Sequence, residues 1–78
     1  MSVTVLYFAS LREAAGRDSE VVPTPASLAA LYDGLRAAHS LPLARERLRV
    51  AVDGAFVEWN AAVRDGAEIA FIPPVSGG

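Results

Sequence analysis

The residues that could most clearly take part in a chemical reaction stand at the end of the sequence. They are Pro73, Pro74, Val75, Ser76, Gly77 and Gly78. The two prolines favour an extended exit that holds the following residues away from the folded body. Gly77 and Gly78 lack a Cβ, so such an end can thread a narrow channel in another protein. The distinctive group of a bare glycine end is its α-carboxylate. Activated as an adenylate, that carboxylate would become an acyl donor to an amine or to sulfur. The alternative is an inert tail.

The other side chains offer few reactive arrangements. His39 is the only histidine, and a surface or helix-capping role is favoured over a place in a serine–histidine–acid triad. The absence of cysteine excludes disulfides, thiolate metal sites and a thiol nucleophile. The chain offers no convincing set of zinc ligands, and no glycine-rich nucleotide loop follows a predicted strand. We therefore expect neither a metal nor a cofactor to be held by this chain.

Hydrophobic periodicity predicts the main helix of the domain that carries this tail. Leu28, Leu31, Tyr32 and Leu35 recur at helical spacing and form one apolar stripe. Ser27 or Thr24 can cap the start of this helix, and residues 39–42 end it. Gly34 lies inside the pattern, which indicates close packing at that position.

Alternating apolar residues predict strands at residues 1–8, 19–22, 48–52, 56–59 and 67–72. A short helix or turn is expected at residues 9–15, ending at Gly16. The pairs Asp53-Gly54 and Asp65-Gly66 are typical of turns. The last strand ends where Pro73 and Pro74 begin, because proline cannot donate to a sheet.

This order of elements indicates an α+β domain of the β-grasp (ubiquitin-like) arrangement. We expect a mixed sheet with the first and last strands adjacent in the middle and one main helix packed across one face. Residues 1–72 would form the domain, and residues 73–78 a flexible C-terminal tail. No second long helix covers the other face, where Leu6, Phe8 and Ile72 would be presented. An uncovered apolar face is typical of a contact surface for a partner.

Composition limits the partners and the compartment. The 78 residues are 53% hydrophobic and 21% charged, which excludes a disordered chain. The net charge of −2 argues against nucleic acid as a partner. No apolar run approaches the ~20 residues that a membrane span needs, and no secretory signal is visible, so we expect a cytoplasmic protein without a membrane partner. All seven basic residues are arginine.

Both ends of the chain together resemble one family. The start, VTVLYFASLREAAG, and the end, DGAEIAFIPPVSGG, are similar to the MoaD/ThiS family of ubiquitin-like sulfur carriers. The Pro-Pro-Val-Ser-Gly-Gly ending after a strand is highly specific for this family. The segment with Phe8, Ala9, Arg12 and Glu13 resembles the branch formed by the small subunits of molybdopterin synthase, and the resemblance covers the whole chain.

The resemblance implies a cycle of activation and sulfur transfer at Gly78. An E1-like adenylyltransferase would adenylate Gly78 with ATP and magnesium, and a sulfur donor (a sulfurtransferase or a cysteine desulfurase) would convert the adenylate to a thiocarboxylate. The tail would then enter the large subunit of molybdopterin synthase and give its sulfur to cyclic pyranopterin monophosphate. The large subunit would supply the catalytic side chains, so this chain would be a non-catalytic sulfur donor. Leu6, Phe8 and Ile72 would bury against that subunit, with Arg12 pairing to an acid at the rim.

Three alternatives stay open at this point. The chain could carry sulfur for another pathway, such as thiamine, a tungsten cofactor or tRNA thiolation. It could be a ubiquitin-like modifier that becomes joined to lysines of other proteins. It could also be a plain interaction module with an inert tail.

Overall fold

The computed structural model describes residues 1–74 of the chain. Five strands, two α-helices and a short 3₁₀ helix follow one another over this range. Their bounds are β1 Ser2–Tyr7, α1 Ala9–Ala15, β2 Ser19–Pro23, α2 Leu28–His39, the 3₁₀ helix Arg45–Arg47, β3 Arg49–Val52, β4 Ala55–Val57 and β5 Glu68–Ile72.

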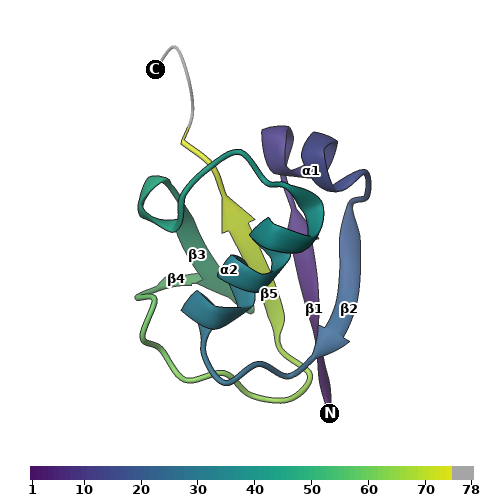
Figure 1. Ribbon diagram of the computed structural model, residues 1–78. Coiled ribbons are helices and arrows are strands. Elements are labelled where there is room, and N and C mark those ends of the chain that lie inside the picture. Colours follow the sequence, from purple (N-terminus) through teal and green to yellow (C-terminus); the bar gives the residue numbers. More distant parts are fainter. Residues whose placement is uncertain (75–78) are drawn as a thin grey trace.

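The strands form one mixed sheet in the order β2-β1-β5-β3-β4. The central strands β1 and β5 are parallel, and every other neighbouring pair is antiparallel. Helix α2 crosses one face of this sheet, and α1 lies at the end where β1 and β5 finish (Figure 1). The predicted β-grasp arrangement, with first and last strands paired in the middle, is confirmed.

Helix α2 is held on the sheet by the apolar stripe that its sequence predicted. Leu28, Leu31, Tyr32 and Leu35 are all buried. The Ser27 hydroxyl caps the helix by accepting a hydrogen bond of 3.0 Å from the amide of Ala30. The helix ends at Ser40, whose backbone is left-handed with φ of 54°.

The predicted close packing at Gly34 is wrong. Gly34 is exposed, and a Cβ built there would meet no heavy atom within 4 Å. The residue lies beside the buried stripe and faces away from the sheet. Gly34 therefore destabilises α2 through the backbone entropy that a glycine loses in a helix, and no close contact at this position offsets the loss.

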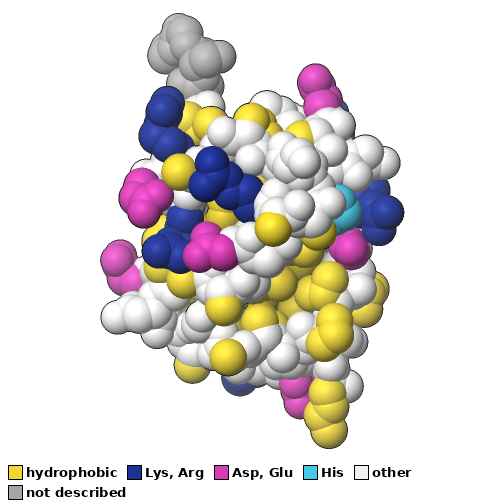
Figure 2. Space-filling model, in the orientation of Figure 1, with side chains coloured by type: hydrophobic (Ala, Val, Ile, Leu, Met, Phe, Trp, Pro, Cys, Tyr) yellow, Lys and Arg dark blue, Asp and Glu magenta, His cyan; other side chains and the backbone are white. Residues whose placement is uncertain are grey.

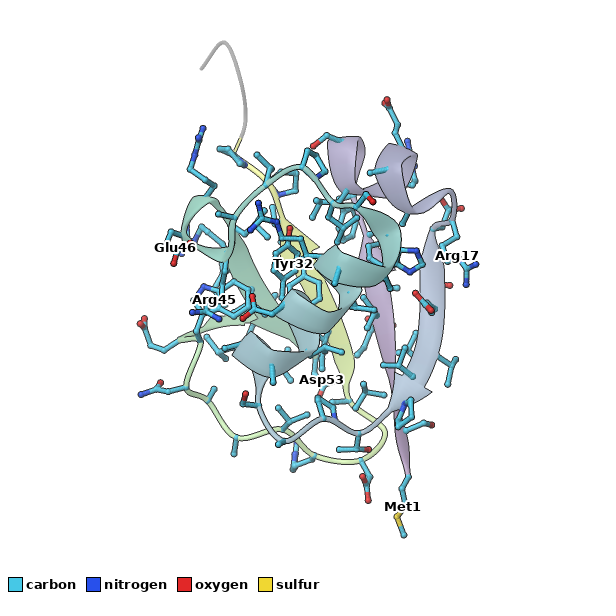
Figure 3. All side chains as sticks on the ribbon, in the orientation of Figure 1. Met1, Arg17, Tyr32, Arg45, Glu46 and Asp53 are labelled. Atoms are coloured by element: carbon cyan, nitrogen blue, oxygen red, sulfur yellow. The ribbon has the colours of Figure 1, made fainter. Side chains whose placement is uncertain are left out.

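An aromatic cluster joins α2, β5 and the segment after β4. Phe71 is fully buried, and its ring centroid lies 5.0 Å from that of Tyr32 and 5.8 Å from that of Trp59. The Tyr32 hydroxyl donates a hydrogen bond of 2.7 Å to the carbonyl of Leu43, so its polar end is satisfied. In Figure 3, Tyr32 lies between the helix and the sheet. The sequence predicted a strand over 56–59, whereas β4 runs over Ala55–Val57 and Trp59 lies in the segment that follows it.

The turn at Asp53-Gly54 fixes the pairing of β3 with β4. Both residues have positive φ, 52° and 87°, as a two-residue type I′ hairpin requires. The Asp53 carboxylate accepts a hydrogen bond of 2.9 Å from the amide of Glu68, which ties this hairpin to β5. As a result Ala51 lies opposite Phe56.

Candidate functional site

The sheet face that α2 leaves uncovered carries a row of apolar residues across four strands. Leu6 pairs with Ala70, Ala70 with Ala51, and Ala51 with Phe56. Large side chains stand at the two ends of this row and alanines in its middle. We call the surface made by Leu6, Phe8, Arg49, Ala51, Phe56, Ala70 and Ile72 the open face.

Phe8 and Ile72 lie at the end of the open face from which the tail leaves. Tyr7 and Phe71 are partners in the parallel pairing of β1 and β5, so the residues that follow them leave the sheet at the same end. The backbone of Phe8 is still extended, which continues the alternation of β1 and turns its side chain to the side of Leu6. The Phe8 side chain is 44% exposed. The prediction that Leu6, Phe8 and Ile72 share one face therefore agrees with the geometry.

The described part of the tail leaves directly from the central strand β5. Pro73 is buried and belongs to the packed body, whereas Pro74 is exposed. Because neither proline has an N–H, β5 cannot extend its pairing beyond Ile72. The tail positions predicted to carry the chemistry, Val75, Ser76, Gly77 and Gly78, lie outside the described residues.

Arg12 lies on α1, at the same end of the sheet as the tail. Its guanidinium is exposed and lies 3.7 Å from the Asp18 carboxylate of the same chain. An exposed pair of this kind contributes little to stability, so Arg12 can exchange Asp18 for another acid at small cost. The predicted pairing of Arg12 with an acid of a partner stays a prediction.

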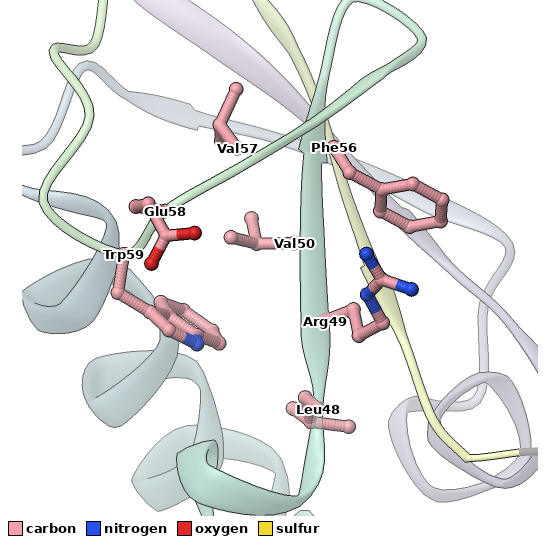
Figure 4. A pocket seen from close by; sticks show the side chains of 7 residues that line it. All are labelled: Leu48, Arg49, Val50, Phe56, Val57, Glu58 and Trp59. Atoms are coloured by element: carbon pink, nitrogen blue, oxygen red, sulfur yellow. The ribbon is translucent and has the colours of Figure 1, made fainter.

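Arg49 and Phe56 belong to the open face and were missed as site residues in the sequence. Both side chains point away from Val50, Val57 and Trp59, on the other side of β3 (Figure 4). The central carbon of the Arg49 guanidinium lies 4.1 Å from the centroid of the Phe56 ring. The sequence did contain a signal that places Phe56 on this face. A two-residue turn at Asp53-Gly54 sets Phe56 opposite Ala51, and Ala51 lies on the same face as Arg49.

A groove of about 360 Å³ opens beside these two residues at the base of the tail. Its apolar lining comes from Leu48, Phe56, Ile72, Pro73 and Pro74, and its charged lining from Glu46, Arg47 and Arg49. The groove therefore joins the open face to the point where the tail leaves. Arginine side chains gather on the β3 side of the molecule in the space-filling view (Figure 2).

The single histidine is neither a free surface residue nor a helix cap. His39 Nε2 lies 2.9 Å from Oε1 of Glu20, which also accepts a hydrogen bond of 2.8 Å from the Tyr7 hydroxyl. Burial alone would raise the pKa of Glu20, but the hydrogen bonds from Tyr7 and His39 outweigh it and hold the pKa below its ordinary value. Burial, with the Glu20 carboxylate beside it, also raises the pKa of Tyr7.

The cluster of Tyr7, Glu20 and His39 ties the end of α2 to the edge strand β2, on the side of the sheet opposite to the open face.

Within residues 1–74, no group of three or more histidine, aspartate or glutamate side chains could hold a metal ion. No helix of that range is long and apolar enough to cross a membrane.

Comparison with known proteins agrees with this geometry. A model of the ThiS family matches residues 5–78. The molybdopterin synthase sulfur carrier subunit of Escherichia coli K12 is 36% identical over 80 residues, covering 97% of this chain and 99% of the relative. The subunit of the same name from Drosophila melanogaster is 36% identical over 84 residues, covering 100% of this chain and 92% of the relative.

Among solved structures, small archaeal modifier protein 1 (SAMP1) from Haloferax volcanii superposes with a TM-score of 0.79 at 28% identity. That alignment covers 100% of each chain. The match to the family model extends over nearly the whole sequence and reaches Gly78. The relative from Escherichia coli, covered over 99% of its length, is identical to this chain at more than a third of the aligned positions. The chain therefore belongs to the ThiS/MoaD family, as the motifs at its two ends predicted.

Proposed function

We propose that this chain is the sulfur-carrying small subunit of a molybdopterin synthase, with Gly78 as the site that bears the sulfur. The observation that carries the proposal is the Pro-Pro-Val-Ser-Gly-Gly sequence placed directly after the central strand β5, within the range that the family model matches. The relatives named as molybdopterin synthase sulfur carrier subunits support the same role.

The proposed chemistry takes place at the carboxylate of Gly78 in two displacement steps. A carboxylate oxygen attacks the α-phosphorus of ATP, and pyrophosphate leaves, which gives an acyl-adenylate. A sulfur nucleophile such as hydrosulfide then attacks the carbonyl carbon, and AMP leaves with its electron pair, which gives a thiocarboxylate. An E1-like adenylyltransferase would hold ATP and magnesium, and a sulfurtransferase or cysteine desulfurase would supply the sulfur. This chain offers no thiol that could compete for the activated carbon.

The open face supports the proposed contact with the large subunit of the synthase. Leu6, Ile72 and Phe56 form preformed apolar area next to the exit of the tail, so a partner that covers the face also receives the tail. Such a surface needs little ordering when it binds, and it can supply most of the affinity. The side chains that act on cyclic pyranopterin monophosphate would then come from the large subunit, and this chain would serve as a non-catalytic sulfur donor in the cytoplasm.

A loading reaction followed by mass spectrometry tests the proposal. The chain is incubated with ATP, magnesium, an E1-like adenylyltransferase and sulfide, and its intact mass is measured. We expect the mass gain for replacement of one oxygen by sulfur, located on the C-terminal peptide. Loaded chain with the large subunit should then convert cyclic pyranopterin monophosphate to molybdopterin. Loading without any molybdopterin formation would favour a carrier for thiamine, a tungsten cofactor or tRNA thiolation.

A ubiquitin-like modifier is the second candidate, because the matched structure from Haloferax volcanii is named a modifier protein. A modifier would form isopeptide bonds between Gly78 and lysines of other proteins. Both functions begin with the same adenylate, so loading alone does not separate them. A blot of lysates with an antibody to this chain separates them, because a carrier gives one band and a modifier gives a ladder of conjugates.

A further inference from the structure

The charged lining of the groove at the base of the tail points to the chemistry of the partner that covers the open face. We infer that Arg49, held over Phe56, receives a carboxylate side chain of the protein that docks on the open face. This inference rests on the proposed function, since it names what the docking surface of that partner must present. It identifies Arg49 as a specificity-determining residue in the contact.

The position of Arg49 over Phe56 prepares its guanidinium for such a ligand. The central carbon of its guanidinium lies 4.1 Å from the ring centroid, within the range of a cation–π contact. A guanidinium has five N–H donors in a planar fork, more than the two that a bidentate carboxylate needs, so the contact with Phe56 is compatible with such a ligand. Phe56 is 54% exposed, and the pair stands at the rim of the open face, where a docking protein reaches it. The contact with Phe56 also reduces the side-chain entropy that Arg49 loses on binding.

No carboxylate of the described residues 1–74 pairs with the guanidinium of Arg49. Four arginines pair with acids of the chain, in the pairs Arg12–Asp18, Arg17–Glu20, Arg45–Asp33 and Arg64–Asp53. Among residues 1–74, no carboxylate oxygen lies within 4.0 Å of a guanidinium nitrogen of Arg47 or Arg49. These two arginines line the groove with one acid, Glu46, so two positive charges stand against one negative charge there. A protein with a net charge of −2 thus presents local positive charge beside the start of its tail.

The apolar lining favours a carboxylate carried by a protein over a phosphate ion. Ile72, Pro73 and Phe56 belong to the apolar lining of the same groove. Ile72 and Phe56 also lie next to the row of Leu6, Ala70 and Ala51 on the open face. A protein side chain can bury apolar atoms against this wall while its carboxylate meets Arg49. A free phosphate would leave the wall uncovered, so the occupant that fits is an acidic side chain beside apolar neighbours on the partner.

Titration calorimetry with the large subunit of the synthase tests this inference. The full chain and the variants Arg49→Ala and Arg49→Glu are compared at low and at high salt. We expect the dissociation constant to rise about tenfold for Arg49→Ala and about a hundredfold for Arg49→Glu, because truncation leaves an acid unpaired and reversal repels it. The salt dependence of binding should weaken for Arg49→Ala, since a surface charge pair is screened by salt. Phe56→Leu keeps the apolar surface and removes the ring, so we expect a smaller loss.

Arg64→Glu serves as the matched control. Arg64 is an exposed arginine in the segment before β5, away from the open face, and its reversal changes the net charge equally. At high salt this control should bind within about twofold of the unaltered chain, because exposed charges separated by more than a Debye length are then largely screened. Circular dichroism verifies that every variant is folded.

Two outcomes would overturn the inference and leave the proposed function standing. The first is binding by both Arg49 variants as tight as that of the unaltered chain. The second is binding of inorganic phosphate or ATP to the chain alone that Arg49→Ala abolishes, which would assign the site to a phosphate. Failure of the unaltered chain to bind the large subunit would instead refute the proposed function, and this inference with it.

Discussion

Tyr7 of β1 lies beside Phe71 of β5 in parallel register, although 64 residues separate them in the sequence. Because parallel neighbours finish at the same end of a sheet, this pairing brings Phe8 to the side of Ile72, next to the point where the tail leaves. The pairing of the first and last strands therefore joins the docking surface to the reactive end. A small domain can in this way present its binding surface and its acyl group to one partner.

The first prediction concerns Ile72 on the open face. Ile72→Asp places a charge in the proposed contact and should weaken binding to the large subunit by several kcal/mol, since an unpaired buried charge is strongly unfavourable. Sedimentation or titration calorimetry measures the loss. Ala30→Asp is the control, because Ala30 is exposed in the first turn of α2, where an acidic residue is favourable. Equal binding by both variants would show that the partner docks elsewhere.

The second prediction separates binding from sulfur transfer. A chain lacking Gly77 and Gly78 should keep the thermal stability of the full chain, because the buried core of the described residues extends only to Phe71 and Pro73. It should keep most of its affinity for the large subunit through the open face, yet carry no sulfur. The truncated chain should therefore inhibit molybdopterin formation competitively when titrated against loaded carrier. Absence of inhibition at severalfold excess would mean that the tail dominates binding.

The third prediction concerns the exposed glycine of α2. Gly34→Ala should stabilise the domain by up to about 1 kcal/mol, because alanine is the better helix former and the position is sterically open. Urea unfolding monitored by circular dichroism measures the change. Gly16→Ala provides the contrast, since Gly16 ends α1 with φ of 74°, and this substitution should destabilise the domain. A loss of stability in Gly34→Ala would indicate a contact at Gly34 that the geometry does not contain.

The fourth prediction concerns the pH dependence of stability. The pKa of Glu20 is lowered in the folded state, so this carboxyl binds fewer protons there than in the unfolded chain. The stability that it contributes is therefore present above the ordinary pKa of 4.5 and is lost as the pH falls through the lower folded value.

Comparing the unaltered chain with Glu20→Gln at neutral pH and near pH 3 measures this effect. The free energy of unfolding should differ at neutral pH, and the difference should shrink in acid. Glu58→Gln, at an exposed position, is the control and should change little at either pH. A constant difference across the range would show that Glu20 acts through packing alone.

Local patterns were sufficient to predict most elements of this fold. The stripe of Leu28, Leu31, Tyr32 and Leu35 predicted α2, and the alternation around Ile69 and Phe71 predicted β5, because each period reflects one buried face. The open face was predicted only in part. Leu6 and Ile72 stood out as apolar residues on the outer side of central strands, whereas Arg49 is charged and Phe56 lies in a three-residue strand. Their contact depends on the register between β3 and β4.

The pairing of His39 with Glu20 could not be read from the sequence. Nineteen residues and the whole of α2 separate them, and only the packing of the helix end over β2 brings them together. The Gly34 prediction failed for a related reason. A helical period identifies the buried stripe, but a glycine beside the stripe can face either the sheet or the solvent, and only the observed orientation of α2 decides this.

The parallel course of β1 and β5 also determines where a reporter group can be attached. Met1 stands at the end of the sheet opposite to Pro74 and is 94% exposed (Figure 3). Because the sequence contains no lysine, a dye directed to an amine at Met1 meets no competing side-chain amine among these 78 residues. A single fluorophore placed there would lie about 25 Å from Pro73, because Phe71 is level with Tyr7 and Pro73 is therefore about eight strand positions from Met1. The anisotropy of the fluorophore would then report docking, and energy transfer to a labelled partner would measure the distance between the two labels, without a probe at the reacting end.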